Sequence, residues 1–222
     1  MKQRAVLTLM VTLGCVLMAW IECVLSPVYP IKSGLKVLIF LACMLVYTGM
    51  TRDYTPFQSL SRPAKGSLRL PLLLAAGVFA VLLGGYALLS PRLDLSAIPG
   101  NLAAKEGFTA QTFPLAAAYI TFCNSFLEEL FFRGFAFLTL YRTGAKRLAW
   151  GFSALTFALY HVTIMDNWFH PVLLVLLTAG LTAAGLFFNY LDRKGSLWPA
   201  WLVHMGANLA INTIALRLWS IV

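Results

Sequence analysis

The chain has 222 residues, of which 60% are hydrophobic and only 11% are charged. A soluble domain of this length needs far more polar surface, so the composition excludes a soluble globular protein and favours a bundle of transmembrane helices. The net charge of +9 comes from basic residues that stand singly or in small groups between apolar runs. That distribution is typical of loops at a membrane surface and argues against a nucleic-acid partner.

Several apolar runs are long enough to cross a hydrocarbon core of about 30 Å. We predict seven spans, separated by prolines, charged stretches and short polar turns. In chain order they cover residues 5–25, 33–50, 71–90, 113–141, 149–165, 170–190 and 197–219. The expected fold is therefore all-α, a polytopic bundle that forms a single transmembrane domain over residues 1–222.

The distribution of basic residues predicts the orientation of the bundle. If the N-terminus is cytoplasmic, most lysines and arginines fall in cytoplasmic segments. The external segments then hold only Lys32, Lys36, Arg92 and Lys105. Because positive charge concentrates in cytoplasmic loops, we expect a cytoplasmic N-terminus.

Three of the predicted spans carry polar side chains in their interiors. The fourth span contains two adjacent glutamates followed by an arginine, the fifth contains a histidine, and the seventh contains a histidine and an asparagine. These residues are Glu128, Glu129, Arg133, His161, His204 and Asn208. At about 1.5 Å rise per residue, the glutamates and histidines lie at similar depth in the bilayer. We therefore expect one cluster of ionisable groups inside the membrane.

Helix spacing indicates which of these side chains can meet. Glu129 and Arg133 are four residues apart and can pair, whereas Glu128 points about 100° away from Glu129. His204 and Asn208 share a face for the same reason. An ionised group at mid-bilayer costs about 2.5–3.5 kcal/mol, so the cluster must face the bundle interior or a wet cavity. A structural ion pair or a packing role is the alternative for any single member, but the group together favours an active site.

The chemistry of these side chains suits hydrolysis. A glutamate beside a histidine in a medium of low dielectric constant can act as a general base. Water deprotonated by such a base can attack a peptide carbonyl, and His204 with Asn208 can stabilise the oxyanion. Two other function classes stay open. One is a proton- or ion-coupled transporter that uses the same Glu, His and Arg cluster, and the other is a non-catalytic membrane scaffold.

Three short motifs resemble those of the CAAX protease and bacteriocin-processing family of intramembrane glutamic-type endopeptidases. They occur in the family's order and on separate spans, as Glu128-Glu129-x-x-x-Arg133, Phe157-x-x-x-His161 and His204-x-x-x-Asn208. The resemblance covers about residues 113–212 and implies that these are the catalytic core helices. The resemblance also implies that Glu128 with His161 activates water. It implies further that Glu129 with Arg133 organises the site, and that His204 with Asn208 stabilises the oxyanion.

The expected reaction uses no cofactor, because the H-E-x-x-H motif of many zinc peptidases is absent. The alternative is one zinc ion held by His161, His204 and Glu128 or Glu129. The expected partners are the lipid bilayer and a membrane-embedded or lipid-anchored protein or peptide substrate, with no nucleic acid. We expect an integral protein of a prokaryotic plasma (inner) membrane.

Overall fold

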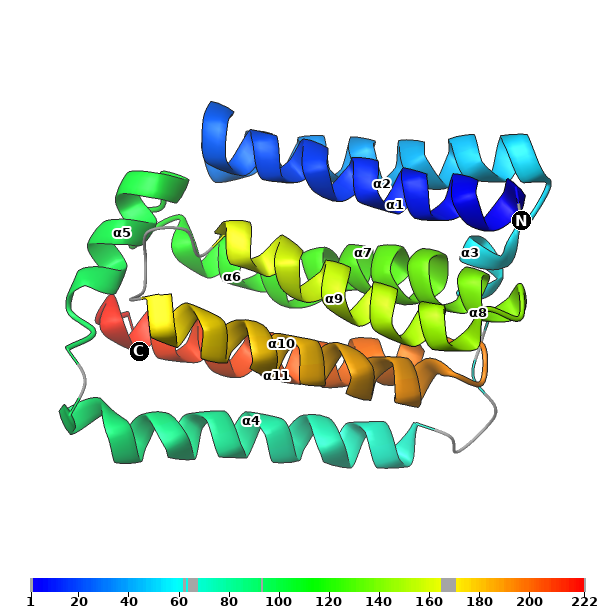
Figure 1. Cartoon of the computed structure of the whole chain (residues 1–222). Helices are drawn as coiled ribbons and strands as arrows, with labels where there is room; N and C mark the ends of the chain where they lie inside the picture. The colour runs from blue at the N-terminus through cyan, green and yellow to red at the C-terminus, as the bar shows by residue number, and fades with distance from the viewer. Residues whose placement is uncertain (1, 62, 64–67, 93, 165–170, 222) are drawn as a thin grey trace.

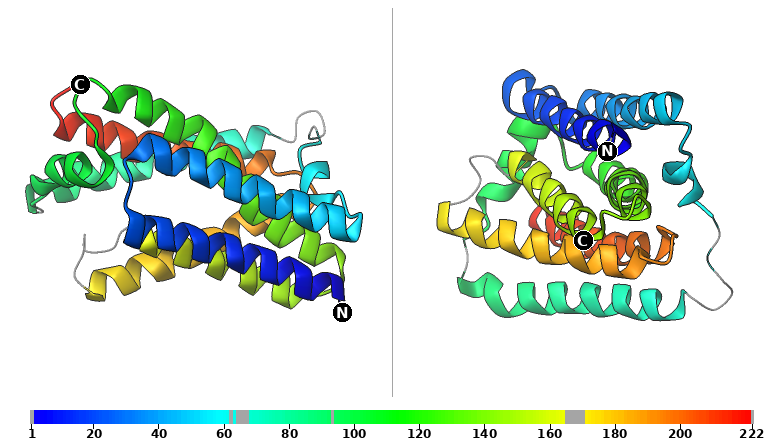
Figure 2. Two further views of the ribbon diagram at one scale, coloured as in Figure 1. Left: turned by 90° about the horizontal axis from the view of Figure 1, so that it is seen from above. Right: turned by 45° about the vertical axis from the view of Figure 1, so that its right-hand side comes forward.

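The computed structural model describes residues 2–61, 63, 68–92, 94–164 and 171–221. Helices are the only regular secondary structure in this part of the chain. Figure 1 shows them stacked in layers, with α1 and α2 on one side, α4 on the opposite side, and the segments α6–α9 and then α10–α11 between them. The views in Figure 2 show the same order of layers. The predicted all-α class is confirmed.

Long helical segments occur at each predicted span. They are α1 (Lys2–Trp20) with the π-helical turn η1 (Ile21–Leu25), α2 (Tyr29–Thr51), α4 (Arg69–Leu89) with the 3-10 turn η2 (Ser90–Arg92), α9 (Lys146–Ile164), α10 (Pro171–Asp192), α11 (Trp198–Leu218), and one continuous segment that consists of α6 (Phe113–Tyr119), η3 (Ile120–Asn124), α7 (Ser125–Glu129), η4 (Leu130–Thr139) and α8 (Leu140–Arg142). The shorter helices α3 (Thr55–Gln58) and α5 (Ala97–Glu106) lie between long segments.

Five of the long segments in the described part of the chain are long and apolar enough to cross a membrane. They cover residues 2–25, 29–51, 69–92, 113–142 and 172–192. Helices α9 and α11 are not in this set, because their polar side chains lower the hydropathy. The protein is therefore an integral membrane protein with five candidate spans, while seven spans and a cytoplasmic N-terminus stay predictions. The span ends predicted at residues 165 and 170 lie outside the described residues.

Helix α2 begins earlier than the predicted span 33–50. It starts at Tyr29, and Pro30 fits its first turn because the N–H groups there have no partner within the helix. Lys32 and Lys36 therefore lie within a helix and are only 5% and 7% exposed. Both were counted with the external segments, and the structure shows that their ammonium groups find acidic partners inside the bundle.

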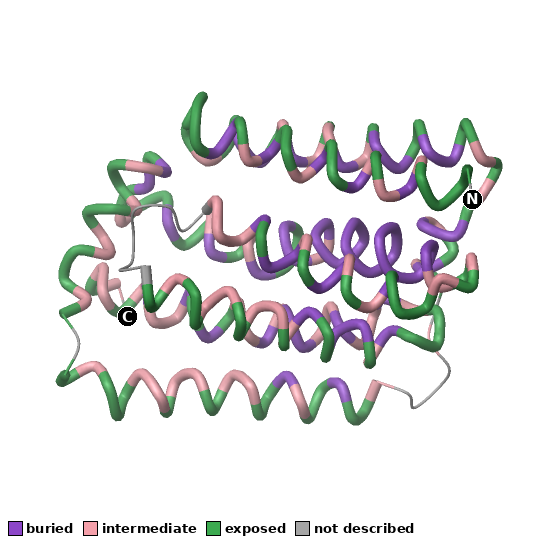
Figure 3. Tube along the Cα trace, viewed as in Figure 1, coloured by how far each residue is buried: buried purple, intermediate pink, exposed green. Residues whose placement is uncertain are grey.

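The core of the molecule surrounds the segment α6–α8. Every residue of η4 is buried, and Figure 3 shows that burial is concentrated in this middle layer. The ring of Phe131 stacks on Phe40 of α2 at a centroid distance of 3.8 Å, and Phe132 meets the same ring edge-on at 6.0 Å. By contrast, only 6% of the residues in the most apolar stretch of the candidate span Arg69–Arg92, which contains α4, are buried. An apolar outer face of this kind is suited to contact with lipid.

Close backbone packing fixes α11 against α4. A Cβ atom added to Gly206 would lie 2.7 Å from the carbonyl oxygen of Ala75 and 3.0 Å from its Cα atom. Those atoms belong to backbone and cannot rotate away, so only glycine permits this approach. The position of α11 matters because the same helix carries His204, two residues before Gly206.

A polar network around Asp53, which follows the second candidate span, joins the ends of α1, α2 and α3. The carboxylate of Asp53 accepts hydrogen bonds from Gln3 of α1 at 2.8 Å, from the Tyr47 hydroxyl of α2 at 2.9 Å, and from the backbone N–H of Thr55 at 2.9 Å. Burial raises the pKa of Asp53, but the hydrogen bonds from Thr55 and Tyr47 and the charge of Arg142 outweigh it and hold this pKa below its usual value.

We expect Gly206→Val to destabilise the bundle, because the new side chain forces α4 and α11 apart. Overpacking of this kind costs about 1–3 kcal/mol, which thermal unfolding in detergent would register as a lower Tm. Gly77→Val is the matched control, since nothing lies within 4 Å of its Cβ position. An equal loss of stability in both variants would contradict this account of the contact.

We expect Asp53→Asn to lower the Tm at neutral pH. A carboxyl whose pKa falls on folding stabilises the protein above the unfolded-state pKa of about 3.9, and this stabilisation is lost as the pH falls through the folded-state pKa. The Tm difference from the wild type should therefore shrink as the pH is lowered below about 4. Asp94→Asn is the control, because within the described residues its carboxylate accepts hydrogen bonds from Ser96 alone, in its own loop. A Tm difference that does not vary with pH would argue against the ionised carboxylate.

Candidate active site

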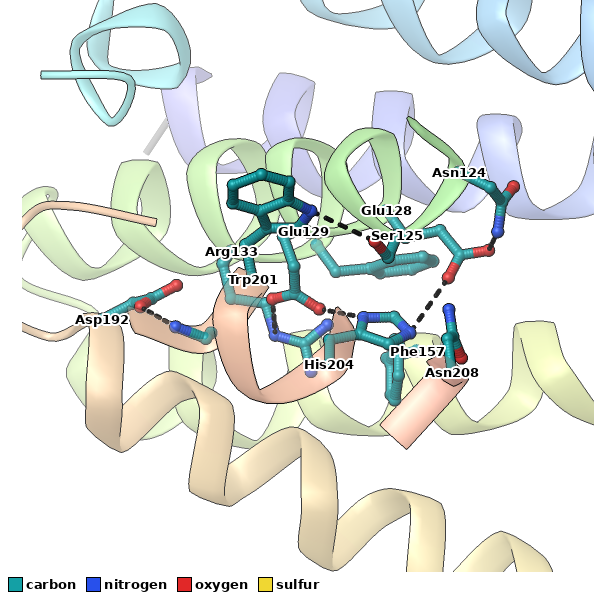
Figure 4. A network of polar contacts seen from close by, with 12 residues as sticks. Asn124, Ser125, Glu128, Glu129, Arg133, Phe157, Asp192, Trp201, His204 and Asn208 are labelled. Atoms are coloured by element: carbon teal, nitrogen blue, oxygen red, sulfur yellow. Dashed lines mark hydrogen bonds and ion pairs between the residues drawn. The ribbon is translucent and has the colours of Figure 1, made fainter. Parts of the chain in front are cut away.

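The two adjacent glutamates lie where the central helical segment changes its winding. Glu128 and Glu129 end the short helix α7, and π-helical turns η3 and η4 flank it on both sides. Such turns are uncommon and frequently occur at functional sites. Ser125 in the same helix accepts a hydrogen bond from the indole N–H of Trp201 at 3.1 Å, which joins α7 to α11 (Figure 4).

Glu128 is the centre of the polar cluster and is only 2% exposed. Its Oε2 atom lies 3.7 Å from Nε2 of His161 and 3.6 Å from Nε2 of His204. Its Oε1 atom accepts hydrogen bonds from the Lys36 ammonium at 2.8 Å and from the Asn124 side-chain amide at 3.0 Å. The two oxygens therefore face different groups, with cation and amide on one side and both imidazoles on the other.

Glu129 contacts a separate set of groups. Its Oε1 atom lies 2.7 Å from Nδ1 of His204, and its Oε2 atom lies 3.2 Å from Nε of Arg133. The second contact is close enough for an ion pair but lacks the alignment of a hydrogen bond. The predicted pairing of Glu129 with Arg133 is thus present. His204 lies between the two glutamates, as Figure 4 shows.

Hydrogen bonds at Nδ1 fix the tautomer of both histidines. Nδ1 of His161 lies 2.8 Å from the carbonyl oxygen of Phe157, which can only accept, so Nδ1 carries the proton. Nδ1 of His204 donates to the carboxylate of Glu129 in the same way. In each neutral ring Nε2 is then the unprotonated nitrogen. Both Nε2 atoms face Oε2 of Glu128, so the three atoms together favour a donor placed between them.

Phe157 has two roles that explain its place in the second motif. Its carbonyl oxygen orients His161, and its ring lies 4.1 Å from the guanidinium carbon of Arg133. Phe188 of α10 approaches the same guanidinium at 4.9 Å. Arg133 is fully buried, and the two rings cover it, which favours the cation electrostatically. Asp192 at the end of α10 also interacts with this charge.

Asn208 lies one helical turn beyond His204, and Figure 4 shows the two side chains in the same cluster. Its side-chain amide donates to the carbonyl oxygen of Ile120 in η3 at 3.3 Å. Asn212, one further turn along, donates to Ala117 and Thr121 at 3.0 and 2.9 Å. The predicted polar stripe of α11 therefore packs against the segment that carries the glutamates.

Three residues of the cluster were missing from the predicted site, namely Lys36, Asn124 and Asp192. Lys36 was left out of the predicted site because it lies near the start of the predicted span 33–50 and was counted with the external basic residues. A signal was present, since Lys32 and Lys36 have helical spacing within an apolar run. Asp192 lies 59 residues beyond Arg133, and no local pattern links them.

Part of the chain matches a known protein family. Residues 110–210 match the family described as type II CAAX prenyl endopeptidase Rce1-like. Neither the search of curated proteins nor that of solved structures returned a match. The matched range contains all three motifs on which the resemblance rests and leaves out α1–α5. The predicted resemblance is confirmed over residues 110–210, where the chain matches the Rce1-like CAAX protease family.

Proposed function

We propose that this protein is an intramembrane endopeptidase that hydrolyses a peptide bond in a membrane-embedded or lipid-anchored protein or peptide. The observation that carries the proposal is the convergence of Glu128 Oε2 with Nε2 of both His161 and His204, at 3.6–3.7 Å, inside an apolar bundle. These distances exceed those of direct hydrogen bonds but suit a water molecule that donates to two of the three acceptors. The match of residues 110–210 to a family of CAAX-type proteases supports the same interpretation.

In the proposed reaction Glu128 acts as the general base. It takes a proton from water while the water oxygen forms a bond to the carbonyl carbon of the substrate, and the carbonyl electron pair moves onto the oxygen. The proton then passes to the amide nitrogen as the C–N bond breaks, which releases an amine and a carboxylic acid. His161 would accept the second hydrogen bond of the water and hold it in line for attack.

Stabilisation of the oxyanion falls to α11 in this proposal. Asn208 can turn its amide from the Ile120 carbonyl toward the substrate oxygen, since the 3.3 Å hydrogen bond between them is a long one. His204 lies one turn away on the same face, and since its Nδ1–H donates to Glu129, it would donate to the oxyanion from Nε2 only as the imidazolium. Glu129 and Arg133 organise the site, because Glu129 holds the Nδ1–H of His204 and Arg133 compensates the charge of Glu129.

The described surface offers an apolar approach to this cluster. A groove of about 680 Å³ lies between α2, α5 and α6, and its walls include Tyr29, Gly34, Leu115 and Tyr119. It shares Tyr29, Ser33, Glu106 and Phe108 with a smaller cavity that extends to Lys36. We propose that the apolar part of a membrane-bound substrate lies in this groove. The proposed location is a prokaryotic plasma (inner) membrane.

The residues fit a zinc site poorly. Among the described residues, no three His, Cys, Asp or Glu side chains are grouped so that they could hold a metal ion. The Lys36 ammonium lies 2.8 Å from Glu128 and would repel a divalent cation at that carboxylate. Glu129 is already engaged by His204 and Arg133. We therefore propose hydrolysis without a metal.

We expect Glu128→Gln to abolish processing of the natural substrate. Loss of a general base reduces rates by about 10²–10⁴-fold, so full-length precursors should accumulate in the membranes of cells that express the variant. Mapping of N- and C-terminal peptides in the membrane proteome would detect them and give the cleavage site. Glu22→Gln is the matched control, because this glutamate is also buried but pairs with Lys32 and does not line the groove. Identical peptide termini in wild type and Glu128→Gln would contradict the proposal, and measurement of proton-coupled uptake in proteoliposomes would then come next.

We expect activity to be independent of zinc. Purified enzyme in lipid nanodiscs should retain its cleavage rate after dialysis against a strong chelator, and elemental analysis should find much less than one metal ion per chain. Loss of activity on chelation, with recovery on addition of Zn²⁺, would support the alternative in which His161, His204 and a glutamate hold the ion.

A further inference from the structure

One strong charge in the cluster comes from outside the segment that the family model matches. Lys36 lies on α2, and its ammonium donates to Oε1 of Glu128 at 2.8 Å and to the side-chain oxygen of Asn124 at 2.6 Å. The side chain is only 9% exposed. The ring of Tyr160 lies below the ammonium, at 5.0 Å. No other acidic side chain pairs with Lys36 among the described residues.

The neighbouring lysine on the same helix has different partners. Lys32 precedes Lys36 by four residues and binds Glu22 at 2.9 Å and Glu106 at 3.0 Å. Each lysine therefore has its own acidic partner, and Glu128 is not a member of the Lys32 network. This separation matters because a buried charge without a partner is strongly disfavoured. The Lys36–Glu128 pair is thus a specific contact.

The geometry of Glu128 shows what the contact does. A carboxylate in a protein interior can rotate about its last torsion, which is broad and roughly two-fold. Here Lys36 and Asn124 both hold Oε1, and Oε2 is left for the two imidazoles. The charge-assisted hydrogen bond also favours the ionised carboxylate, which is the form that accepts a proton.

We propose that Lys36 is a positioning residue of the active site, which keeps Glu128 negatively charged and directs its Oε2 atom toward His161 and His204. The inference rests on the proposed role of Glu128 as a base and extends the site beyond the family segment to the N-terminal helices. Lys36 also lines a cavity of about 140 Å³, together with Tyr29, Ser33 and Glu106.

Every charged or titratable group around Glu128 bears on its protonation. The groups in contact come from three helices, namely Lys36 of α2, His161 of α9 and His204 of α11. Groups that interact at longer range are Tyr29, Arg133 and Tyr160. Lys36 is the nearest permanent cation of this set. Its removal should therefore alter Glu128 more than any other single substitution on α2.

Infrared spectroscopy of the full-length protein in lipid nanodiscs tests the proposal without any substrate. The chain has only four glutamates, Glu22, Glu106, Glu128 and Glu129, so labelling of glutamate with ¹³C gives few bands. The difference between wild type and Glu128→Gln identifies the band of Glu128. We expect an ionised carboxylate at neutral pH in the wild type. In Lys36→Met the same group should take up its proton at a pH about 1–3 units higher.

Two further variants separate charge from structure. Lys36→Arg keeps a cation and should restore most of the wild-type titration, whereas Lys36→Gln keeps a hydrogen-bond donor without the charge and should behave like Lys36→Met. Lys32→Met removes a buried lysine one turn away, and it should change the bands of Glu22 and Glu106 but not that of Glu128. Thermal unfolding identifies the variants that fold. A Glu128 titration that is the same in wild type and in a folded Lys36→Met or Lys36→Gln variant would overturn the proposal.

Kinetics with the peptide identified through Glu128→Gln provides the second measurement. Lys36→Met should lower kcat on the order of 10²-fold with little change in KM, because misplacement of the base affects the chemical step. The acidic limb of its pH–rate profile should move to higher pH together with the infrared titration. If wild-type protein cleaves no peptide, the proposed function fails, while the infrared result still decides the role of Lys36.

Discussion

Pairing of buried charges is the constraint on which the rest of this structure depends. Groups of opposite charge are paired across the bundle, Lys36 with Glu128 and Arg133 with Glu129 and Asp192, and His204 bridges the two glutamates. In a medium of low dielectric constant none of these groups is tolerated alone. Since α2, α7, η4, α10 and α11 each contribute at least one member, satisfying the charges also specifies which helices must meet. The same contacts therefore form the polar cluster and determine how the helices pack.

The apolar surroundings strengthen the electrostatic interactions within the cluster. Aromatic rings cover the charges on several sides, with Phe157 and Phe188 on Arg133 and Tyr160 below Lys36. They exclude water from most of the cluster and leave His161, whose side chain is 20% exposed, as its most accessible member. Electrostatic interactions among fixed groups are strong in such a place. Rigid backbone contacts, such as that of Gly206 with Ala75, hold the helices that carry these groups.

Local spacing predicted part of this arrangement and distant contacts determined the rest. The pairing of Glu129 with Arg133 follows from their separation of four residues, and the long helical segments follow from the apolar runs between prolines and charged stretches. The contact of Lys36 with Glu128 spans 92 residues of sequence and depends on how α2 packs against the central segment. The dual contact of His204 with both glutamates has the same origin. Helix periodicity gives the direction in which a side chain points, but it does not say which helix lies opposite.

The two lysines of α2 have a consequence for biogenesis. Synthesis runs from the N-terminus, so α1 and α2 leave the ribosome before the central segment exists. Lys32 can find Glu22 at once, because only ten residues separate them. Lys36 has to wait until Glu128 is made, and in that interval its long side chain must reach toward the nearer membrane surface. Completion of the cluster then draws its ammonium inward, so assembly of the cluster and the final packing of α1 and α2 on the bundle are the same event.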